Sequence, residues 1–388
     1  ESLKGYGRVN DPYIAHTLWQ DAREKSFKDP WQSAGAWDLY PGDSLYYYYG
    51  GYFSSYLIET YGMEKYTDLW HETGKGNIFL GLSGAVKKIY GKNINRLWKE
   101  FYSGFISGPD FQNPPPHIIK GERSLSAITG RADIIYDSDA FTRSLRILDL
   151  SDSRESVILP FDAVDLSLSP SGEKLLITTI EKKGTAYVFL TRIYLTGSRT
   201  FMPFRETGLR NSLFIDENKI AAVTLEGEET VLKVFDAEGS RVILYGNPEH
   251  VLGSIHPWNS EKLLLLSNYK GNRIIGTVAL ETGRYDPLPL PDLGGLEARI
   301  RDVYSEEERI LLSVGDGEGF HRLAYFSEGT WYYQTTKISG GVFKPRLSGP
   351  GVLYTGRFSK GDILFTAELS GFTLERIAHK PAFGYETR

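Results

Sequence analysis

One short apolar segment recurs six times between residues 134 and 353, and this repeat restricts the possible fold more than any other feature. Each copy is a run such as KLLIT at 174–178, preceded by a polar turn and followed by a second β-rich run. The marker positions are 41, 45, 43, 47 and 43 residues apart at Ile134, Leu175, Ile220, Leu263, Ile310 and Leu353. This spacing is typical of a four-stranded propeller blade.

A single blade cannot bury both of its faces, so blades of this kind stack in a ring. The repeat therefore predicts a mainly β fold with a six-bladed β-propeller over residues 120–388. Two unrelated β-sandwiches also place turns about every 8–12 residues, but they do not give six strands at near-constant spacing. We expect 372–377 to be the last outer strand of the sixth blade. The ring would then close by packing of blade one against blade six.

The first part of the chain has helical rather than strand periodicity. Tyr52, Phe53, Tyr56, Leu57 and Tyr61 fall at helical spacing, and Gly62 ends that helix. Asn93 is a suitable cap for a later helix. These patterns predict a small helical domain over residues 1–107. A proline-rich linker over 108–119 follows it.

Composition excludes several classes of function. The net charge of −5 and the lack of a basic cluster argue against nucleic-acid binding. No apolar run is long enough to predict a membrane span. Because the chain contains no cysteine, disulfides and thiolate metal sites are excluded, and an extracytoplasmic location is mildly favoured. The chain opens at Glu1 without a signal peptide, so we expect it to be a fragment of a longer protein.

The segment LSPSGEKLLI at 168–177 resembles the turn and strand of the TolB-type propeller repeat, which is WD40-like in form. The match is good in one blade and degenerate in the other five. This resemblance implies a six-bladed ring in a periplasmic, cell-envelope or secreted protein. It also implies a role in protein contacts, or as a non-catalytic domain beside a peptidase.

The segment YYGGYFSSYLIETYG at 48–62 is similar to the region downstream of the zinc site in gluzincin (peptidase MA-like) metallopeptidases. In this resemblance Tyr48 occupies the place of the tyrosine that can hydrogen-bond the oxyanion. The opening residues 1–8 look like the stretch that follows the helix carrying the third zinc ligand. The resemblance implies that residues 1–107 are the C-terminal helical part of such a domain.

These enzymes hold zinc with the motif H-E-x-x-H, which this chain lacks. The nearest string is His71-Glu72-Thr73-Gly74-Lys75, which we interpret as a solvated helix end. We therefore expect no catalysis, no metal ligand and no cofactor in this chain. Zinc would belong to a longer parent protein, and only in such a parent would Tyr48 be catalytic.

Other candidate residues have structural interpretations. No two of the seven histidines fall at i, i+3 or i, i+4, and His250 and His256 are expected to be solvated loop residues. The acidic, glycine-rich segment at 316–319 is more typical of a hairpin tip than of a calcium-binding loop. The tyrosine run 46–49 either lines a pocket or packs at a helix start. We expect core or interdomain packing for Trp31, Trp37, Trp70 and Trp98.

The leading functional hypothesis is a cell-envelope or secreted, non-catalytic propeller that binds a protein or peptide. Its partners would include the missing N-terminal peptidase lobe, to which the propeller can gate access. The alternative is that the chain is the C-terminal portion of a zinc metallopeptidase whose H-E-x-x-H motif lies upstream.

Overall fold

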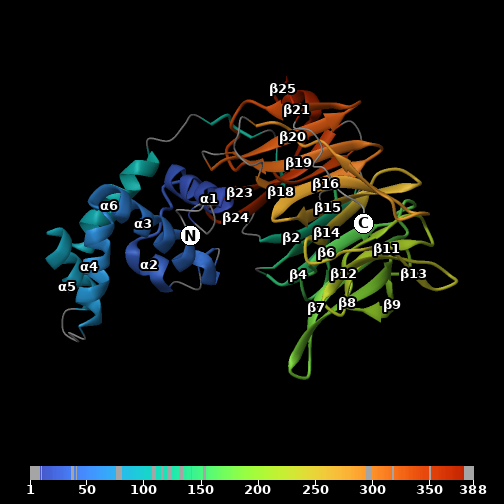
Figure 1. Ribbon diagram of the computed structural model, residues 1–388, viewed down its shortest axis with the longest axis horizontal. Helices are drawn as coiled ribbons and strands as arrows, with labels where there is room; N and C mark the ends of the chain where they lie inside the picture. Colours follow the sequence, from blue (N-terminus) through green and yellow to red (C-terminus); the bar gives the residue numbers. More distant parts are fainter. Residues whose placement is uncertain are drawn as a thin grey trace.

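The structure is a computed structural model that consists of a helical lobe beside a ring of β-sheets (Figure 1). It describes residues 9–379, except 10, 36–38, 41, 76–80, 107–110, 115–116, 120–123, 131–133, 141, 152–153, 294–298, 317–318 and 349–350. The predicted opening segment 1–8 and part of the predicted linker therefore lie outside the described residues. No helix among the described residues is long and apolar enough to cross a membrane.

The described part of the helical lobe contains six α-helices. They are α1 (Pro12–Arg23), α2 (Pro30–Gly35), α3 (Leu45–Tyr61), α4 (Met63–Gly74), α5 (Gly81–Tyr90) and α6 (Ile94–Ile106), with a 3₁₀ turn η3 (Gly42–Ser44) before α3. Gly62 ends α3 with a φ of 90°, which glycine adopts at little cost. The Asn93 side chain accepts a hydrogen bond from the Arg96 amide at 2.8 Å. Both predicted helix boundaries are therefore confirmed.

Aromatic side chains fill the core of the lobe. Tyr49 of α3 and Trp98 of α6 stack there, with their ring centroids 6.0 Å apart. The Tyr49 hydroxyl donates to the buried carboxylate of Asp21, and the Trp98 indole N–H donates to the Lys28 carbonyl. Desolvation raises the pKa of Asp21 to about 6, although Lys28 and Tyr49 oppose this shift. The lobe thus has a core of its own, separate from that of the ring.

Six antiparallel sheets form the ring, and each is one blade. Blades 1 to 3 contain β2 (Leu125–Gly130), β3 (Ile134–Asp139), β4 (Ser144–Asp149) and β5 (Arg154–Leu159); β6 (Asp165–Leu168), β7 (Lys174–Lys183), β8 (Ala186–Leu195) and β9 (Thr200–Thr207); and β10 (Arg210–Phe214), β11 (Ile220–Glu226), β12 (Glu229–Phe235) and β13 (Ser240–Tyr245). Blades 4 to 6 contain β14 (His250–Pro257), β15 (Lys262–Tyr269), β16 (Asn272–Ala279) and β17 (Tyr285–Leu288); β18 (Arg299–Glu306), β19 (Arg309–Gly315), β20 (His321–Ser327) and β21 (Thr330–Gln334); and β22 (Phe343–Ser348), β23 (Gly351–Phe358) and β24 (Gly361–Glu368). All six predicted marker residues lie in the second strand of their blade, so the predicted six-bladed β-propeller is confirmed.

The ring closes through a shared strand, and the expected closure by face packing alone is wrong. Strand β1 (His117–Ile119) pairs antiparallel with β24 and becomes the outer strand of blade 6, although it precedes blade 1 in the chain. The predicted last strand is β25 (Leu374–Ile377), but it pairs with β21 as a fifth strand of blade 5. A short 3₁₀ turn, η4 (Leu369–Gly371), separates β24 from β25. Hydrogen bonds of β1 with β24 therefore fasten the beginning of the propeller to its last blade.

The innermost strands add a second closure between blades 6 and 1. The Lys344 ammonium of β22 donates to the Ser126 carbonyl of β2 at 2.6 Å and also to the Leu125 carbonyl. On the same seam, the Leu125 amide donates to the Asp362 carboxylate at 3.0 Å. The two blades are thus joined by hydrogen bonds near the channel as well as at the rim.

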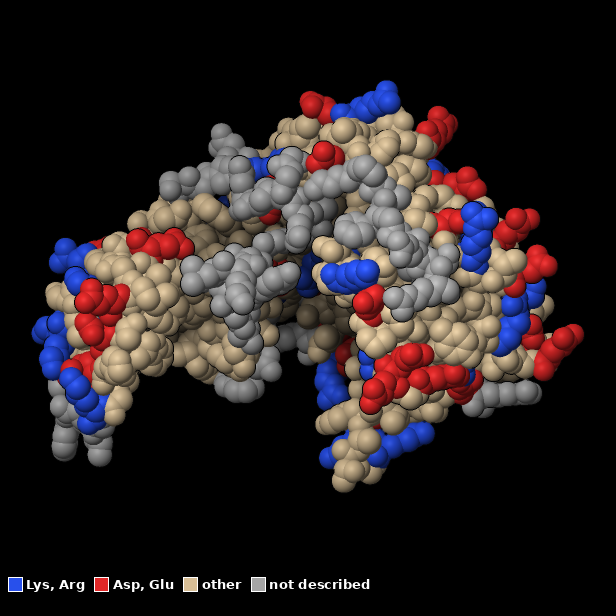
Figure 2. All heavy atoms as spheres, viewed as in Figure 1, with Lys and Arg blue, Asp and Glu red and all other residues tan. Residues whose placement is uncertain are grey.

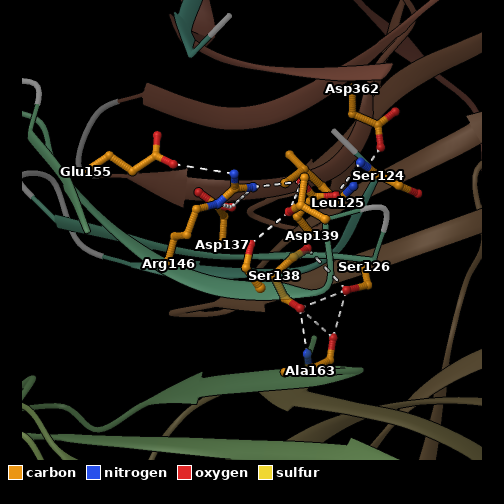
Figure 3. Close-up of polar contacts among 12 residues, drawn as sticks. Ser124, Leu125, Ser126, Asp137, Ser138, Asp139, Arg146, Glu155, Ala163 and Asp362 are labelled. Atoms are coloured by element: carbon orange, nitrogen blue, oxygen red, sulfur yellow. Dashed lines mark hydrogen bonds and ion pairs between the residues drawn. The ribbon is translucent and has the colours of Figure 1, made fainter. Parts of the chain in front are cut away.

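Blade 1 is joined to blade 2 by serine hydroxyls (Figure 3). Ser126 and Ser138 both donate to the Ala163 carbonyl, at 2.7 and 2.9 Å, and the Ala163 amide donates back to Ser138. This small network provides hydrogen-bond partners for both backbone groups of Ala163, in the loop that leads into β6. The polar backbone groups at this seam therefore have partners, while the Ala163 side chain belongs to the apolar core that blades 1 and 2 share.

Beside this seam, blade 1 contains a buried ion cluster (Figure 3). Asp137 and Asp139 are fully buried, and Arg146 donates to both of them, at 2.9 and 3.1 Å from Nη2. Glu155 lies 3.4 Å from the Arg146 Nη1 atom. Among the described residues, the carboxylates that meet this guanidinium all come from the same sheet. The cluster therefore connects strands β3, β4 and β5 of blade 1.

Lys344→Met should destabilise the propeller, because it leaves two backbone carbonyls at the closing seam without their charged donor. We expect a loss of roughly 1–3 kcal/mol in the free energy of unfolding, measured by chemical denaturation. Lys360→Met, in the exposed turn between β23 and β24, is the matched control and should have little effect. Equal stability of the two variants would show that the Lys344 hydrogen bonds contribute nothing to the stability of the propeller.

Candidate binding site at the lobe–propeller junction

Helix α1 joins the lobe to the ring because it has two buried faces. Ile14 and Leu18 lie in the lobe core, whereas Tyr13, His16 and Gln20 contact the propeller. These two sets follow i, i+4 and i, i+3, i+7 spacing, so each forms one stripe on the helix. The helix packs against β20 of blade 5 and β23 of blade 6. Asp11 caps its first turn by accepting from the Tyr13 amide at 2.9 Å.

Polar contacts fix the position of α1 on the ring. The Gln20 side-chain oxygen accepts from the Gly340 amide at 3.2 Å and from the Ser339 hydroxyl at 3.3 Å. At the end of the helix, the Glu24 carboxylate accepts from the amide and hydroxyl of Ser359. Because Gln20 and Ser339 are buried, loss of this contact would leave polar groups without partners. The lobe is therefore docked in a defined orientation.

Two histidines that are far apart in sequence meet at this junction. The rings of His16 and His321 are both almost fully buried, with centroids 6.4 Å apart and Phe343 packed against each. Among the residues that the structure describes, neither histidine has a carboxylate within ion-pair distance. Burial lowers the pKa of His16 to about 4, and burial also lowers that of His321. Both rings are therefore neutral at neutral pH.

Tyr13 is held between two arginines of the propeller. The Arg301 and Arg357 guanidinium carbons lie 3.7 and 4.2 Å from its ring centroid. Arg357 also lies over the Tyr40 ring and is 3.7 Å from the Asp362 carboxylate. Such cation–π contacts are strongest when the cation is desolvated, and Arg357 is only 2% exposed. This cluster adds charge as well as apolar area to the junction.

Tyr48, the one predicted catalytic residue, lies at the same junction. It is half-buried on α3, and its ring meets that of Tyr13 edge-on at 6.4 Å. Burial raises the pKa of Tyr48, and the positive charge of Arg301 partly offsets this. Its neighbours in the run differ from it, because Tyr46 and Tyr47 are exposed while Tyr49 is in the core. Its proposed role in oxyanion binding stays a prediction.

The channel through the ring is lined by charged residues of the innermost strands. Asp165 of β6 accepts from the Ser212 amide of β10 at 2.7 Å, and Asp302 of β18 accepts from the Lys344 amide of β22 at 3.1 Å. The two aspartates have equivalent places in their blades, because Asp165 pairs with Thr178 and Asp302 pairs with Ser313, each three residues after the marker residue of its blade. Burial raises the pKa of Asp165 to about 6, against the effect of Arg346. Channel carboxylates thus hold neighbouring blades together.

Several sequence-based expectations about single residues need correction. His250 and His256 are not solvated loop residues: both lie in β14, where His250 is fully buried beside Ser267 and His256 is partly buried near the channel. Trp98 is buried as predicted, but Trp31 and Trp70 are 65% and 55% exposed. The ends of strands and helices have few apolar residues in a regular pattern. The burial of single residues there is therefore the hardest property to predict from the sequence.

Other expectations agree with the structure or lie outside it. His71 is exposed near the end of α4, and Glu72 pairs with Lys75 and Lys88, as expected for a solvated helix end. The string at 316–319 lies between β19 and β20, as a hairpin tip should, although 317 and 318 are outside the described residues. Trp37 also lies outside them. No group of three or more His, Cys, Asp or Glu that can hold a metal occurs among the described residues.

Comparison with known proteins gives distant matches. No family model matches the chain. An uncharacterised protein of Treponema pallidum (strain Nichols) is 24% identical over 364 residues, which covers 87% of this chain and 33% of that protein. The chain therefore spans about a third of the length of this curated relative.

Among solved structures, TolB from Acinetobacter baumannii is similar at 15% identity, with a TM-score of 0.49 and 66% of each chain covered. The propeller domain of the Trilobed protease from Pyrococcus furiosus is similar at 11% identity, with a TM-score of 0.45, over 69% of this chain and all of that one. An oligogalacturonate lyase in complex with manganese is similar at 15% identity, with a TM-score of 0.45, over 61% and 74%. The order of the strands makes this chain a six-bladed β-propeller, and TolB is one of its structural neighbours.

His16→Phe should make the protein less sensitive to acid. The pKa of His16 is lower in the folded state than its ordinary value of 6.5, so stability is present above pH 6.5 and is lost as the pH falls towards 4. Between these two pH values the variant should lose less free energy of unfolding than the wild type, by up to about 3 kcal/mol. His71→Phe, at an exposed position, should retain the wild-type pH profile. Parallel profiles for wild type and His16→Phe would contradict the prediction.

Proposed function

We propose that this chain is a non-catalytic, protein- or peptide-binding propeller of the periplasm, the cell envelope or the extracellular space. The observation that carries the proposal is the long hairpin β7–β8, which projects from blade 2 (Figure 1). Its two strands have ten residues each, whereas the inner strand β6 of the same blade has four. Figure 2 shows the surface hollowed between this hairpin and the helical lobe.

The outer part of the hairpin has an apolar face that extends beyond its sheet. Ile180 pairs with Phe189, and Lys182 pairs with Tyr187, so these four side chains lie on one face. Ile180 is 48% exposed and Tyr187 is 72% exposed. Arg210 stacks over the Phe189 ring at 4.6 Å. A protruding face that is both apolar and basic suits a protein segment with apolar and acidic side chains.

The docked lobe supports the same proposal. Helix α1 holds the lobe on blades 5 and 6 through buried contacts, so the wall of the hollow that the lobe forms has a fixed position. A pre-formed surface loses less conformational entropy when it binds a partner than a mobile one does. The absence of cysteine is compatible with the proposed oxidising compartments.

The double variant Ile180→Ser, Tyr187→Ser should weaken partner binding at least tenfold while leaving the melting temperature nearly unchanged, because both side chains are exposed. The partner is first identified with a photo-crosslinking amino acid at position 187, and its affinity is then measured by calorimetry. Tyr245→Ser is the matched control, because Tyr245 is 59% exposed on the outer strand of blade 3. Undiminished affinity in the double variant would reject the hairpin as the binding surface.

A second candidate is that the lobe belongs to a gluzincin-like zinc peptidase in a longer protein, with the propeller gating access to it. The position of Tyr48 supports this candidate, because its ring meets α1 and lies near Arg301 of the propeller. The described residues contain no set of side chains that fits zinc, so its ligands would come from outside them. An H-E-x-x-H motif upstream of Glu1 in the gene would favour this candidate, and its absence would remove it.

In such a zinc-bearing parent, Tyr48→Phe should reduce turnover by about 10²–10³-fold, because one oxyanion donor is lost. Stability should change little, since the ring itself is retained. Tyr47→Phe, at the neighbouring exposed position, should leave turnover unaltered. If Tyr48→Phe turns over substrate at the wild-type rate, the residue has only a packing role.

A further inference from the structure

Arg346 is an unusual arginine because it lies in the propeller channel without a direct partner. It belongs to β22, the innermost strand of blade 6, and its side chain is only partly exposed. Among the described residues its guanidinium makes no hydrogen bond and has no carboxylate within ion-pair distance. Its guanidinium carbon lies 5.2 Å from the centroid of the Tyr304 ring. Its charge is thus partly withdrawn from bulk water, without an ion pair among the described residues.

Arg146 shows what a structural arginine looks like in this protein. Its guanidinium meets Asp137 and Asp139 at hydrogen-bond distance inside one blade. Removing a charge from water costs several kcal/mol unless partners replace the lost hydration. Arg146 has such partners, whereas Arg346 has not. This difference indicates that the donors of Arg346 are available to a group that is not part of the chain.

Residues of three other blades interact electrostatically with Arg346. Its charge acts on Asp165 of blade 2 and on His256 of blade 4, while Asp302 and Tyr304 of blade 5 act on Arg346 in turn. The two carboxylates already accept backbone amides of neighbouring blades, so they are engaged in holding the ring.

The charges of the channel define the class of ligand. Asp302 and Asp362 act on Lys344 with negative charge, and Arg301 and Arg346 act on it with positive charge. Asp165 and Asp302 also act on Arg346, so a dianion there would meet more repulsion than a single negative charge. The planar guanidinium matches the two oxygens of a carboxylate in a bidentate pair. Burial and the Arg346 charge lower the pKa of His256 to about 3, so its imidazole is neutral, and its Nε2 atom lies 3.1 Å from the Ser254 hydroxyl.

We propose that the channel binds a carboxylate at Arg346, supplied either by the C-terminus of a peptide or by an acidic side chain. The guanidinium pairs with the two carboxylate oxygens, and Tyr304 and His256 border the site. This proposal is independent of the hairpin surface β7–β8. The two can therefore fail separately.

The test uses the full chain and four short, N-acetylated probe peptides. Triglycine with a free C-terminus offers a terminal carboxylate, and Gly-Gly-Glu amide offers a side-chain carboxylate. Triglycine amide and Gly-Gly-Gln amide are the uncharged counterparts. Binding is followed by the arginine side-chain NMR signals, in which the Arg346 signal is identified by its loss in Arg346→Lys. We expect at least one carboxylate peptide to shift that signal and to bind at least tenfold more tightly than its amide.

Arg346→Gln should abolish this difference between carboxylate and amide peptides. Arg309→Gln should retain it, because Arg309 pairs with Glu307 in the β18–β19 turn. Equal affinity for carboxylates and amides, an unmoved Arg346 signal, or the same shift with sodium chloride at equal ionic strength would each overturn the proposal. If Arg346→Gln does not fold, as judged by circular dichroism, the wild-type comparison still decides. The peptide that binds identifies the source of the carboxylate.

Discussion

The rest of the structure depends on the pairing of β1 with β24, because these backbone hydrogen bonds join the two ends of the ring. An open ring would expose one face of blade 1 and one face of blade 6, and both are apolar. The three-residue strand His117–Ile119 prevents this by joining the beginning of the propeller to its last blade. Lys344 repeats the connection at the channel, through the carbonyls of β2. Closure thus uses backbone pairing at the rim and the partly buried Lys344 ammonium near the centre.

Closure also determines where the helical lobe can bind. Helix α1 packs on blades 5 and 6, which are the blades that receive β25 and β1. The arginines that hold Tyr13 come from the same two blades. The lobe therefore contacts the part of the ring that carries the additional strands. The hairpins of blades 2 to 4 are available for other contacts, and β7–β8 is the longest of these hairpins.

The blade count could be predicted because the second strand of every blade is buried on both faces. Such strands read as continuous apolar runs, and Leu175 and Leu263 mark two of them clearly. The inner and outer strands are shorter and more polar, so their boundaries carry a weaker signal. Strand β1 follows three prolines and has only three residues, which makes it look like part of a linker.

The site was harder to predict because its parts are brought together only by the fold. His16 and His321 do not belong to one local sequence motif, and no sequence pattern near Gln20 predicts that its partner is Gly340. The importance of Arg346 lies in what surrounds it, not in its sequence neighbours. A search for histidines at helical spacing finds only pairs that lie on one helix. The His16–His321 contact joins a helix of the lobe to a strand of the propeller, so such a search cannot find it.

The attachment of both β1 and β25 to neighbouring blades has a mechanical consequence. Tension applied through the segments that flank the propeller would act first on blades 5 and 6, while blades 1 to 4 would bear load only through their neighbours. The short strands β1 and β25 would be sheared or peeled from β24 and β21 before any four-stranded sheet is extended. Under such a pull, ring opening and release of the helical lobe would begin in the same place.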